Sequence, residues 1–329
     1  MSATPLLSVK DLGVVFSTPR GALQAVDGLT LDIRPGEILG LVGESGSGKS
    51  VTLRAILRLL RGAATVSGQI HFKGEDLLNA PERRMQQLRG GSIGMIFQEP
   101  MTALNPVLTI GLQIEETLAA HGLRQGSARR ASAIELLRQV GIPSPQSRLG
   151  AYPHEFSGGM RQRAMIAIAL AASPTLLLAD EPTTALDVTI QDQILKLLKR
   201  LTSELGMAMI LVTHDLGVVA ETCDRVTVMY AGRVAETAPV ETLFAAPRHA
   251  YTQALLRSAP HGGTPRTMLN PIQGQPPHLA APARGCAFAP RCDFAVAQCS
   301  TARPPLEALA EDQSSACLAR DRLPPWRAA

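Results

Sequence analysis

The order of apolar and polar positions predicts short strands that alternate with helices. Apolar or alternating runs typical of strands occur at 7–15, 29–33 and 38–42, and again at 176–179, 208–213 and 225–230. Residues 51–60 repeat apolar side chains at helical spacing directly after a glycine-rich stretch. Because buried strands and helices alternate in this way, we expect an α/β fold with a parallel core sheet.

Two segments depart from this alternation. Between about 99 and 162 the pattern is helical, most clearly at 110–121 and 128–140, which predicts a helical subdomain inserted into the core. After Phe244 the composition changes. Eleven of the 24 prolines lie between Pro260 and Pro325, too many for continuous helices or central strands. We therefore expect a main domain over 1–245 and a small, loop-rich C-terminal module over 246–329.

Composition and charge narrow the function classes. The chain of 329 residues is long enough for a large buried core, and its formal charge of +4 is small. The sequence shows no basic run with interleaved aromatics, so we expect no nucleic-acid binding. No segment reaches the ~20 apolar residues that cross a bilayer, and residues 1–10 lack the pattern of a secretory signal. We expect a cytosolic protein that reaches a membrane only by docking on proteins already there.

The stretch Gly43–Ser50 matches the pattern G-x-x-x-x-G-K-S. Its glycines let backbone N–H groups curl around phosphates, and the N-terminus of the following helix adds positive potential. We expect Lys49 to reach the β- and γ-phosphates of ATP and the Ser50 hydroxyl to bind Mg²⁺. The alternative is an ordinary glycine-rich turn, and the flanking strand and helix argue against it. The residues assigned to ATP binding here are Gly43, Glu44, Ser45, Gly46, Ser47, Gly48, Lys49, Ser50 and Val51.

A second candidate site lies at the end of the apolar run 176–179, which Asp180 and Glu181 follow. Asp180 is placed to hold Mg²⁺, and Glu181 is placed to orient and deprotonate the attacking water. The alternative is a solvated turn. This alternative is less favoured because a phosphate-binding loop precedes these acids in the chain.

Between the two motifs stands Phe156-Ser157-Gly158-Gly159-Met160. The three motifs together resemble those of the ATP-binding cassette (ABC) family, and the resemblance covers about residues 5–245. It implies that two ATPase subunits close ATP between them, with Ser157, Gly158, Gly159 and Met160 completing a site on the partner. The commonest form of this signature is L-S-G-G-Q. The phenylalanine and methionine forms found here occur in the peptide-importer branch.

The resemblance assigns roles to residues outside these motifs. Gln98 resembles the family's Q-loop glutamine, which senses the γ-phosphate and Mg²⁺, and His214 resembles the switch histidine that contacts the γ-phosphate. The run Thr184-Ala185-Leu186-Asp187 resembles the D-loop, which crosses the dimer interface. Phe16 lies about where the family has an aromatic residue that stacks on adenine, and its alternative is a core or turn aromatic.

The C-terminal part carries a resemblance of its own. Residues 249–256 resemble the H-P-Y-T-x-x-L-L element of oligopeptide and dipeptide importer ATPases, with Ala250 at the position of the usual proline. Residues 285–292 resemble their G-C-x-F-x-P-R-C run, and Cys299 and Cys317 continue it. The resemblance is specific to a branch that imports peptides, nickel chelates and related small solutes.

The clustered cysteines of this region form a candidate metal site, made of Cys286, Cys292, Cys299 and Cys317. Structural zinc prefers paired C-x₂₋₄-C knuckles, whereas iron–sulfur clusters tolerate looser spacing. Some members of the branch carry a 4Fe–4S cluster on such cysteines. We therefore rank a cluster above structural Zn²⁺, and unligated thiols below both. The isolated Cys223 is interpreted as a buried small hydrophobe.

These resemblances predict the ATP-hydrolysing subunit of an importer for peptides or a related solute. The implied partners are a second ATPase subunit in a heterodimer, two transmembrane permeases and an extracytoplasmic solute-binding protein. The chain is then peripheral, at the cytoplasmic face of the membrane. The alternatives are a soluble cassette ATPase acting on ribosomes or DNA, and a phosphate-loop kinase. No tandem cassette or basic extension is visible to support the first, and the signature and D-loop argue against the second.

Overall fold

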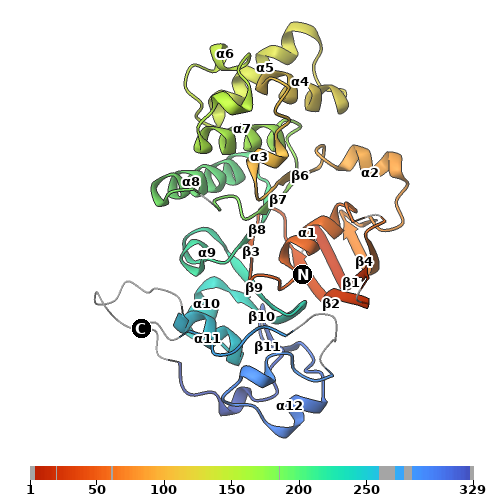
Figure 1. The fold of residues 1–329 in the computed structure, drawn as a ribbon, viewed down its shortest axis with the longest axis vertical. Helices are drawn as coiled ribbons and strands as arrows, with labels where there is room; N and C mark the ends of the chain where they lie inside the picture. Colours follow the sequence, from red (N-terminus) through yellow and green to blue (C-terminus); the bar gives the residue numbers. More distant parts are fainter. Residues whose placement is uncertain are drawn as a thin grey trace. The chain divides into compact units, whose positions relative to one another are not determined.

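The computed structural model describes residues 4–19, 21–60, 62–184, 186–258, 271–277 and 284–326. The chain divides into two compact units. The first is made of Met1–Arg34, Ile38–Leu78 and Val212–Ala329, and the second of Pro35–Glu37 and Asn79–Leu211. Figure 1 follows the chain through both by colour.

The N-terminal part of the first unit is an antiparallel sheet with the strand order β2-β1-β4-β5. Its strands are β1 (Leu7–Thr18), β2 (Gly21–Ile33), β4 (Ala64–Phe72) and β5 (Glu75–Asp76). β1 pairs with both β2 and β4; the register with β2 shifts after Val9, Leu12 and Val14, and the register with β4 shifts after Lys10. Leu7, Val9, Leu12 and Val14 of β1 are fully buried, so the central strand of this sheet anchors it to the core.

A second sheet of the first unit runs in the order β11-β12-β10-β9-β3. Its strands are β3 (Ile38–Val42), β9 (Arg225–Tyr230), β10 (Arg233–Pro239), β11 (Glu307–Ala310) and β12 (Gln313–Ser315). β3 and β9 are parallel and wholly buried, and the pairs further along the sheet are antiparallel. The C-terminal module therefore supplies two strands that extend the sheet beyond β10, a contribution that its proline content did not predict.

The helices of the first unit are short. They are α1 (Lys49–Ile56), α9 (Leu216–Thr222), α10 (Val240–Ala245), α11 (Ala250–Ser258) and α12 (Ala297–Thr301), with 3-10 turns at Ala289–Arg291 and Arg320–Arg322. One apolar cluster joins Val42 and Tyr230 of the sheet to Tyr251 and Phe288 of the C-terminal module. The module thus shares its core with the strands that carry the nucleotide motifs of this unit.

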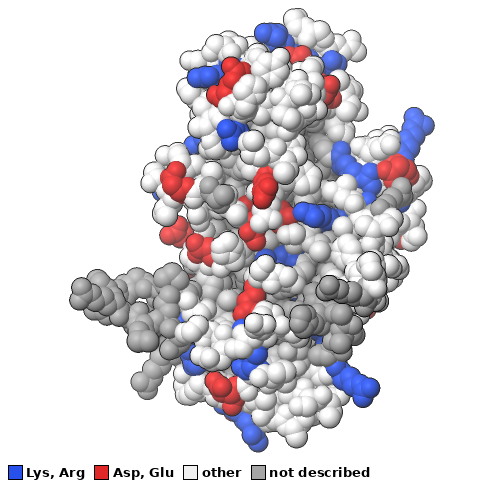
Figure 2. Space-filling model, viewed as in Figure 1, with Lys and Arg blue, Asp and Glu red and all other residues white. Residues whose placement is uncertain are grey.

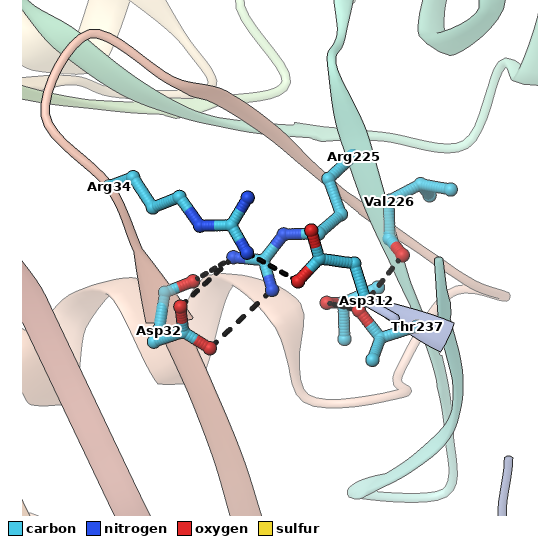
Figure 3. A network of polar contacts seen from close by, with 7 residues as sticks. Asp32, Arg34, Arg225, Val226, Thr237 and Asp312 are labelled. Atoms are coloured by element: carbon cyan, nitrogen blue, oxygen red, sulfur yellow. Dashed lines mark hydrogen bonds and ion pairs between the residues drawn. The ribbon is translucent and has the colours of Figure 1, made fainter. Parts of the chain in front are cut away.

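A polar network links the end of β2 to β9 and to the hairpin β11-β12 (Figure 3). Arg225 donates from Nη2 to the backbone carbonyl of Asp32 at 2.6 Å and pairs with its carboxylate at 3.3 Å. Arg34, just after β2, forms an ion pair with Asp312 between β11 and β12. Both contacts lie at the end of β2.

The second unit contains a parallel pair of strands and most of the long helices. β6 (Ile93–Ile96) and β7 (Leu176–Asp180) pair in parallel and are wholly buried, and β8 (Ala208–Thr213) follows them in the order β8-β7-β6. The helices are α2 (Glu82–Leu88), α3 (Pro100–Ala103), α4 (Ile110–Ala120), α5 (Gly126–Gln139), α6 (Pro145–Arg148), α7 (Gly158–Leu170) and α8 (Val188–Leu205), with a 3-10 turn at Pro153–Glu155. The helices predicted at 110–121 and 128–140 are confirmed as α4 and α5.

Two observations concern the surface. Within the described residues, no helix is both long enough and apolar enough to cross a bilayer. On the face drawn in Figure 2, basic and acidic side chains are interspersed, without a broad area of one sign. This distribution fits the small net charge of the chain.

Candidate nucleotide-binding site

The predicted phosphate-binding loop, Gly43–Ser50 (the phosphate loop below), follows β3 and leads into α1. Gly43 has φ 150° and Gly48 has φ 99°, backbone conformations that residues with side chains rarely adopt. A Cβ at Gly43 would lie 2.1 Å from the carbonyl O of Met229, and a Cβ at Gly48 would lie 2.5 Å from the carbonyl O of Ala25. The loop is therefore packed so closely against β9 and β2 that glycine is required at both positions.

Lys49, the first residue of α1, is buried, and its side chain turns back along the loop. Its Nζ donates to the carbonyl O of Gly43 at 2.8 Å and to that of Glu44 at 3.0 Å, and lies 3.4 Å from Ser47 Oγ. The ammonium group and the first N–H groups of α1 give this loop the positive potential that a phosphate requires.

The other predicted residues of the loop stand nearer to solvent. Ser45 and Gly46 are exposed at its tip, and Ser50 and Val51 are half-buried in the first turn of α1. The serine hydroxyls and the backbone N–H groups of the tip are thus within reach of a ligand outside the core.

Two further predicted residues belong to the first unit. Phe16 is half-buried near the end of β1, opposite Leu23 of β2 and Ala64 of β4. His214 is exposed directly after β8, and the next residue, Asp215, caps α9 by accepting a hydrogen bond of 2.8 Å from a backbone N–H. Neither side chain is part of the buried apolar core.

In the second unit the acidic strand end lies beside Gln98. Asp180 is fully buried as the last residue of β7, and Glu181 follows with φ 45°, a left-handed conformation unusual for a residue with a side chain. Glu181 Oε2 accepts hydrogen bonds from Thr184 Oγ1 at 2.8 Å and from Gln98 Nε2 at 3.3 Å. Gln98 follows β6, the parallel neighbour of β7, so adjacent strand ends bring these groups together.

The signature forms the N-terminus of α7. Ser157 is its N-cap, and Ser157 Oγ accepts a hydrogen bond of 3.3 Å from the Met160 N–H. Ser157 and Gly158 are exposed, whereas Gly159 and Met160 are half-buried. Phe156 is buried and anchors the motif, a task that leucine also performs by its apolar character. An exposed helix N-terminus with two glycines is chemically suited to a phosphate group.

The predicted D-loop ends at the N-cap of α8. Asp187 Oδ1 accepts a hydrogen bond of 2.9 Å from a backbone N–H in the first turn of that helix. Leu186 lies near the start of α7, since its Cδ2 is 3.8 Å from where a Cβ on Gly158 would stand. Ala185 lies outside the described residues. Val188, the first residue of α8, is 82% exposed, an apolar side chain in solvent beside these two motifs.

The clustered cysteines pack together in the first unit. Cys299 and Cys317 are buried, Cys286 and Cys292 are half-buried, and all four are free thiols. Burial raises the pKa of the Cys292 thiol to about 11 and also raises the pKa values of Cys286 and Cys317. Cys223, interpreted from sequence as a buried hydrophobe, is half-buried and packs against the core around β3 and β9.

Backbone hydrogen bonds reach three of the clustered sulfurs. They come from Phe288 to Cys286, from Phe294 to Cys292 and from Ala250 to Cys317. In the part of the chain that the structure describes, no group of three or more His, Cys, Asp or Glu side chains is arranged to hold a metal ion. The metal site expected from the sequence therefore stays a prediction.

Known proteins share both the nucleotide motifs and the C-terminal region. A family model described as "ABC transporter" matches residues 26–184, and one described as "Oligopeptide/dipeptide transporter, C-terminal region" matches residues 235–299. An ATP-binding protein of Brucella ovis, provisionally named for peptide import, is 52% identical over 97% of this chain and 98% of its own length. The chain belongs to the ABC transporter ATP-binding family.

Other similar proteins and solved structures support the same family assignment. A probable peptide ABC transporter ATP-binding protein of Sinorhizobium fredii is 52% identical, over 95% of this chain and 94% of that protein. A dimeric cassette solved in a post-hydrolysis state with ADP and phosphate has a TM-score of 0.64 and 30% identity, and covers 71% of this chain and 98% of its own. The cassette cbiO1 of Clostridium perfringens has a TM-score of 0.62 and 28% identity, and the match covers 74% of this chain and 91% of that one. The predicted α/β ABC ATPase fold is confirmed.

Tyr251 and Arg291 of the ABC ATPase contact the phosphate loop at Glu44, a relationship that its sequence pattern alone does not predict. Both residues stand inside the C-terminal motifs, at 249–256 and 285–292. Their place inside these two motifs is the sequence feature that could have identified them as functional residues. Ala250 is the first residue of α11, a position at which proline is also favoured.

Proposed function

We propose that this ABC ATPase energises the uptake of di- or oligopeptides, or of a related small solute, as the ATP-hydrolysing subunit of an importer. The proposal is carried by the match of residues 235–299 to the oligopeptide/dipeptide transporter C-terminal region. Relatives at 52% identity over nearly the whole chain bear names of peptide import or peptide ABC transport. A role on ribosomes or DNA has no comparable support.

In the phosphate loop, Lys49 and the backbone N–H groups are proposed to hold the β- and γ-phosphates of ATP, while Phe16 stacks on adenine. The packing of Gly43 and Gly48 supports this assignment, because a Cβ at either position would meet a backbone carbonyl. The backbone N–H groups of the loop are then proposed to bind the phosphates, whatever the rest of the nucleotide is.

Ser50, Gln98 and Asp180 are the oxygen-bearing residues proposed for Mg²⁺. Hydroxyl, amide and carboxylate oxygens are the ligands that Mg²⁺ prefers. When bound with ATP, the metal neutralises charge on the β- and γ-phosphates. Asp180 supports the assignment through its place at the carboxyl end of β7, directly before Glu181.

Glu181 is the proposed general base and His214 the proposed contact to the γ-phosphate. Thr184 and Gln98 both donate to Glu181 Oε2, so the carboxylate is held in one orientation. From there Glu181 accepts the proton of the attacking water while the phosphoryl group is displaced.

The signature and D-loop are proposed to act across a dimer. Ser157 to Met160 would complete the ATP site of a partner, and Ala185, Leu186 and Asp187 would lie at the interface. The exposure of Ser157, Gly158 and Val188 supports this, because these groups stand ready for contact with another molecule. The partners proposed are a second, different ATPase subunit, two permeases and an extracytoplasmic solute-binding protein, with the chain peripheral at the cytoplasmic face of the membrane.

The four clustered cysteines are proposed to hold a 4Fe–4S cluster, with structural Zn²⁺ as the alternative. Supporting the cluster are the shared packing of Cys286, Cys299 and Cys317 and the backbone hydrogen bonds to three sulfurs, a feature that tunes such clusters. A single Zn²⁺ requires tighter convergence, with each sulfur about 2.3 Å from one ion. Iron, acid-labile sulfide and zinc analysis of anaerobically purified protein decides between them.

The transport proposal is tested by co-expressing the tagged chain with the permeases encoded beside it. We expect both permeases to co-purify, and ATP hydrolysis by the complex in proteoliposomes to rise with peptide and a binding protein. A chain that leaves the permeases behind, and whose ATP hydrolysis is stimulated by ribosomes or DNA instead, would refute transport.

A further inference from the structure

Glu44, the second residue of the phosphate loop, is held by the C-terminal module at both its side chain and its backbone. Its carboxylate accepts two hydrogen bonds from Arg291, Nη1 to Oε2 at 2.8 Å and Nη2 to Oε1 at 3.0 Å. Its backbone N–H donates to the Tyr251 hydroxyl at 2.9 Å. Two residues more than 200 positions away in the sequence therefore meet at one residue of the loop.

Arg291 is fully committed to this position. Its Nε donates to the carbonyl O of Gln273 at 2.8 Å, Nη1 donates also to the Tyr230 hydroxyl at 3.0 Å, and Nη2 donates also to the carbonyl O of Ile272 at 3.4 Å. With the two bonds to Glu44, all five N–H donors of the guanidinium have acceptors. The side chain is only 6% exposed, so its charge is matched by the carboxylate of Glu44 away from bulk water.

The Tyr251 side chain is also held firmly in place. It is fully buried, and its ring centroid lies 4.6 Å from that of Tyr230 and 5.4 Å from that of Phe288. The start of α11 is held in turn by Glu236, whose carboxylate accepts backbone hydrogen bonds of 2.7 Å and 2.9 Å from the residues just before the helix. The hydroxyl that binds Glu44 therefore stands on a rigid support.

The charge of Glu44 gives this clamp a consequence for nucleotide binding. A phosphate loop receives a polyanion, and a carboxylate within it repels that ligand unless a cation neutralises it. Arg291 supplies the cation in a bidentate geometry that lysine cannot reproduce. The Arg34–Asp312 pair (Figure 3) and the Arg303–Asp27 pair already fasten the C-terminal module elsewhere, so this clamp is not required merely to attach it.

We propose that Arg291 and Tyr251 are positioning residues of the nucleotide site: they fix Glu44 and neutralise its charge, so that the C-terminal module sets the affinity of the phosphate loop for ATP. The inference rests on the proposed role of this loop in ATP binding. Arg291 lies next to Cys292 in the chain, and the 3-10 turn Ala289–Arg291 joins it to the cysteine group, so the clamp is built from the same turn as that group.

The test measures the Kd of the full-length chain for a non-hydrolysable ATP analogue with Mg²⁺. Arg291→Gln is expected to raise the Kd about tenfold or more, because it leaves a carboxylate unpaired beside the phosphates. The double variant Arg291→Gln with Glu44→Gln should recover most of this loss, since removal of both partners leaves no unpaired charge. Tyr251→Phe, which removes one oxygen only, should raise the Kd about fivefold. A merely structural support would not give the recovery in the double variant.

Controls separate the possible failures. Arg34→Gln breaks the Arg34–Asp312 ion pair of the module without touching the loop, and its Kd should equal that of wild type. Lys49→Ala tests the loop itself: if this variant keeps wild-type affinity, the proposed ATP site fails rather than the clamp. A wild-type Kd in Arg291→Gln, or a double variant as weak as the single one, overturns the inference. Where Arg291→Gln does not fold, a wild-type Kd in Tyr251→Phe overturns it.

Discussion

Gln98 donates a hydrogen bond of 3.3 Å from its Nε2 to Oε2 of Glu181, although 83 residues separate the two in sequence. They meet because β6 and β7, which precede them, are parallel neighbours. Glu181 also has φ 45°, a backbone conformation that costs about 1–3 kcal/mol for a residue with a side chain. A carboxylate held in a costly conformation, and oriented by two donors, is better explained by chemistry than by folding.

Glu181→Gln is therefore expected to lower kcat for ATP hydrolysis by about 10²–10⁴-fold, because an amide cannot accept the proton of the attacking water. The affinity for Mg·ATP should stay near that of wild type, since the proposed phosphate-binding groups lie in the loop of the first unit. Phosphate release and equilibrium nucleotide binding measure the two quantities. Glu204→Gln, an exposed acid on α8, is the matched control and should change neither. Turnover near the wild-type rate in Glu181→Gln would exclude Glu181 as the base.

Ser157→Arg tests whether the signature serves a second subunit. The added cation and bulk at the exposed N-cap of α7 should block closure on a partner's phosphate, so turnover in the assembled pair is expected to fall at least about tenfold. Nucleotide binding by the same chain should persist, because its own loop is unchanged. Ser127→Arg, in the exposed first turn of α5, provides the control for an added arginine at a helix start. Loss of binding by the isolated Ser157→Arg chain would argue that the signature acts within one subunit.

Stability is expected to depend on pH through His249. Burial lowers the pKa of His249 from 6.5 to about 4, and its neutral ring accepts the Tyr251 N–H at Nδ1 over 3.0 Å. The unfolded chain takes up a proton near pH 6.5, which the folded chain refuses until about pH 4. The free energy of unfolding contributed by this group is therefore present above pH 6.5 and falls by about 3 kcal/mol as the pH drops to 4.

Urea denaturation at a series of pH values measures this dependence. His249→Asn should flatten it, whereas His154→Asn, which alters an exposed histidine, should leave it unchanged. Burial raises the pKa of Glu236, so that carboxyl contributes stability that is lost as the pH rises, the opposite sense. The difference between wild type and variant cancels Glu236 and isolates His249. Parallel curves for wild type and His249→Asn would contradict the assignment.

The elements around the nucleotide motifs could be predicted because their signals are local. Apolar runs at 38–42 and 176–179 mark β3 and β7, and three- and four-residue spacing marks α4 and α5. The wholly buried strands of a parallel sheet leave little ambiguity in such runs. The strand β2 is longer than the predicted 29–33, because residues 21–28 carry glycine at both ends and no clear alternation, and they are held in the strand by pairing with β1.

The C-terminal module shows where local signals end. Its prolines predict loops, but β11 and β12 form by adding to β10, where Glu236 is paired with Ser315, and such an edge depends on a distant partner. The clamp on Glu44 has the same character: a glutamate in a glycine-rich loop gives no sign that Arg291 will pair with it. Long-range pairing, rather than propensity, decides both features.

Ala250→Pro introduces the proline of the H-P-Y-T-x-x-L-L element that residues 249–256 resemble, and tests the start of α11. Proline fits the backbone of the first helical position but removes the Ala250 N–H that bonds to the Cys317 sulfur, so the free energy of unfolding is expected to fall by about 1 kcal/mol, the contribution of one such bond. Leu255→Pro, in the interior of the same helix, should cost about 3 kcal/mol or more because it removes an intrahelical hydrogen bond and clashes with the preceding turn. Chemical denaturation of the two variants gives both values. If Ala250→Pro costs as much as Leu255→Pro, the backbone hydrogen bond from Ala250 to the Cys317 sulfur is needed for this junction to form, and the alanine is a requirement of this chain rather than a neutral exchange.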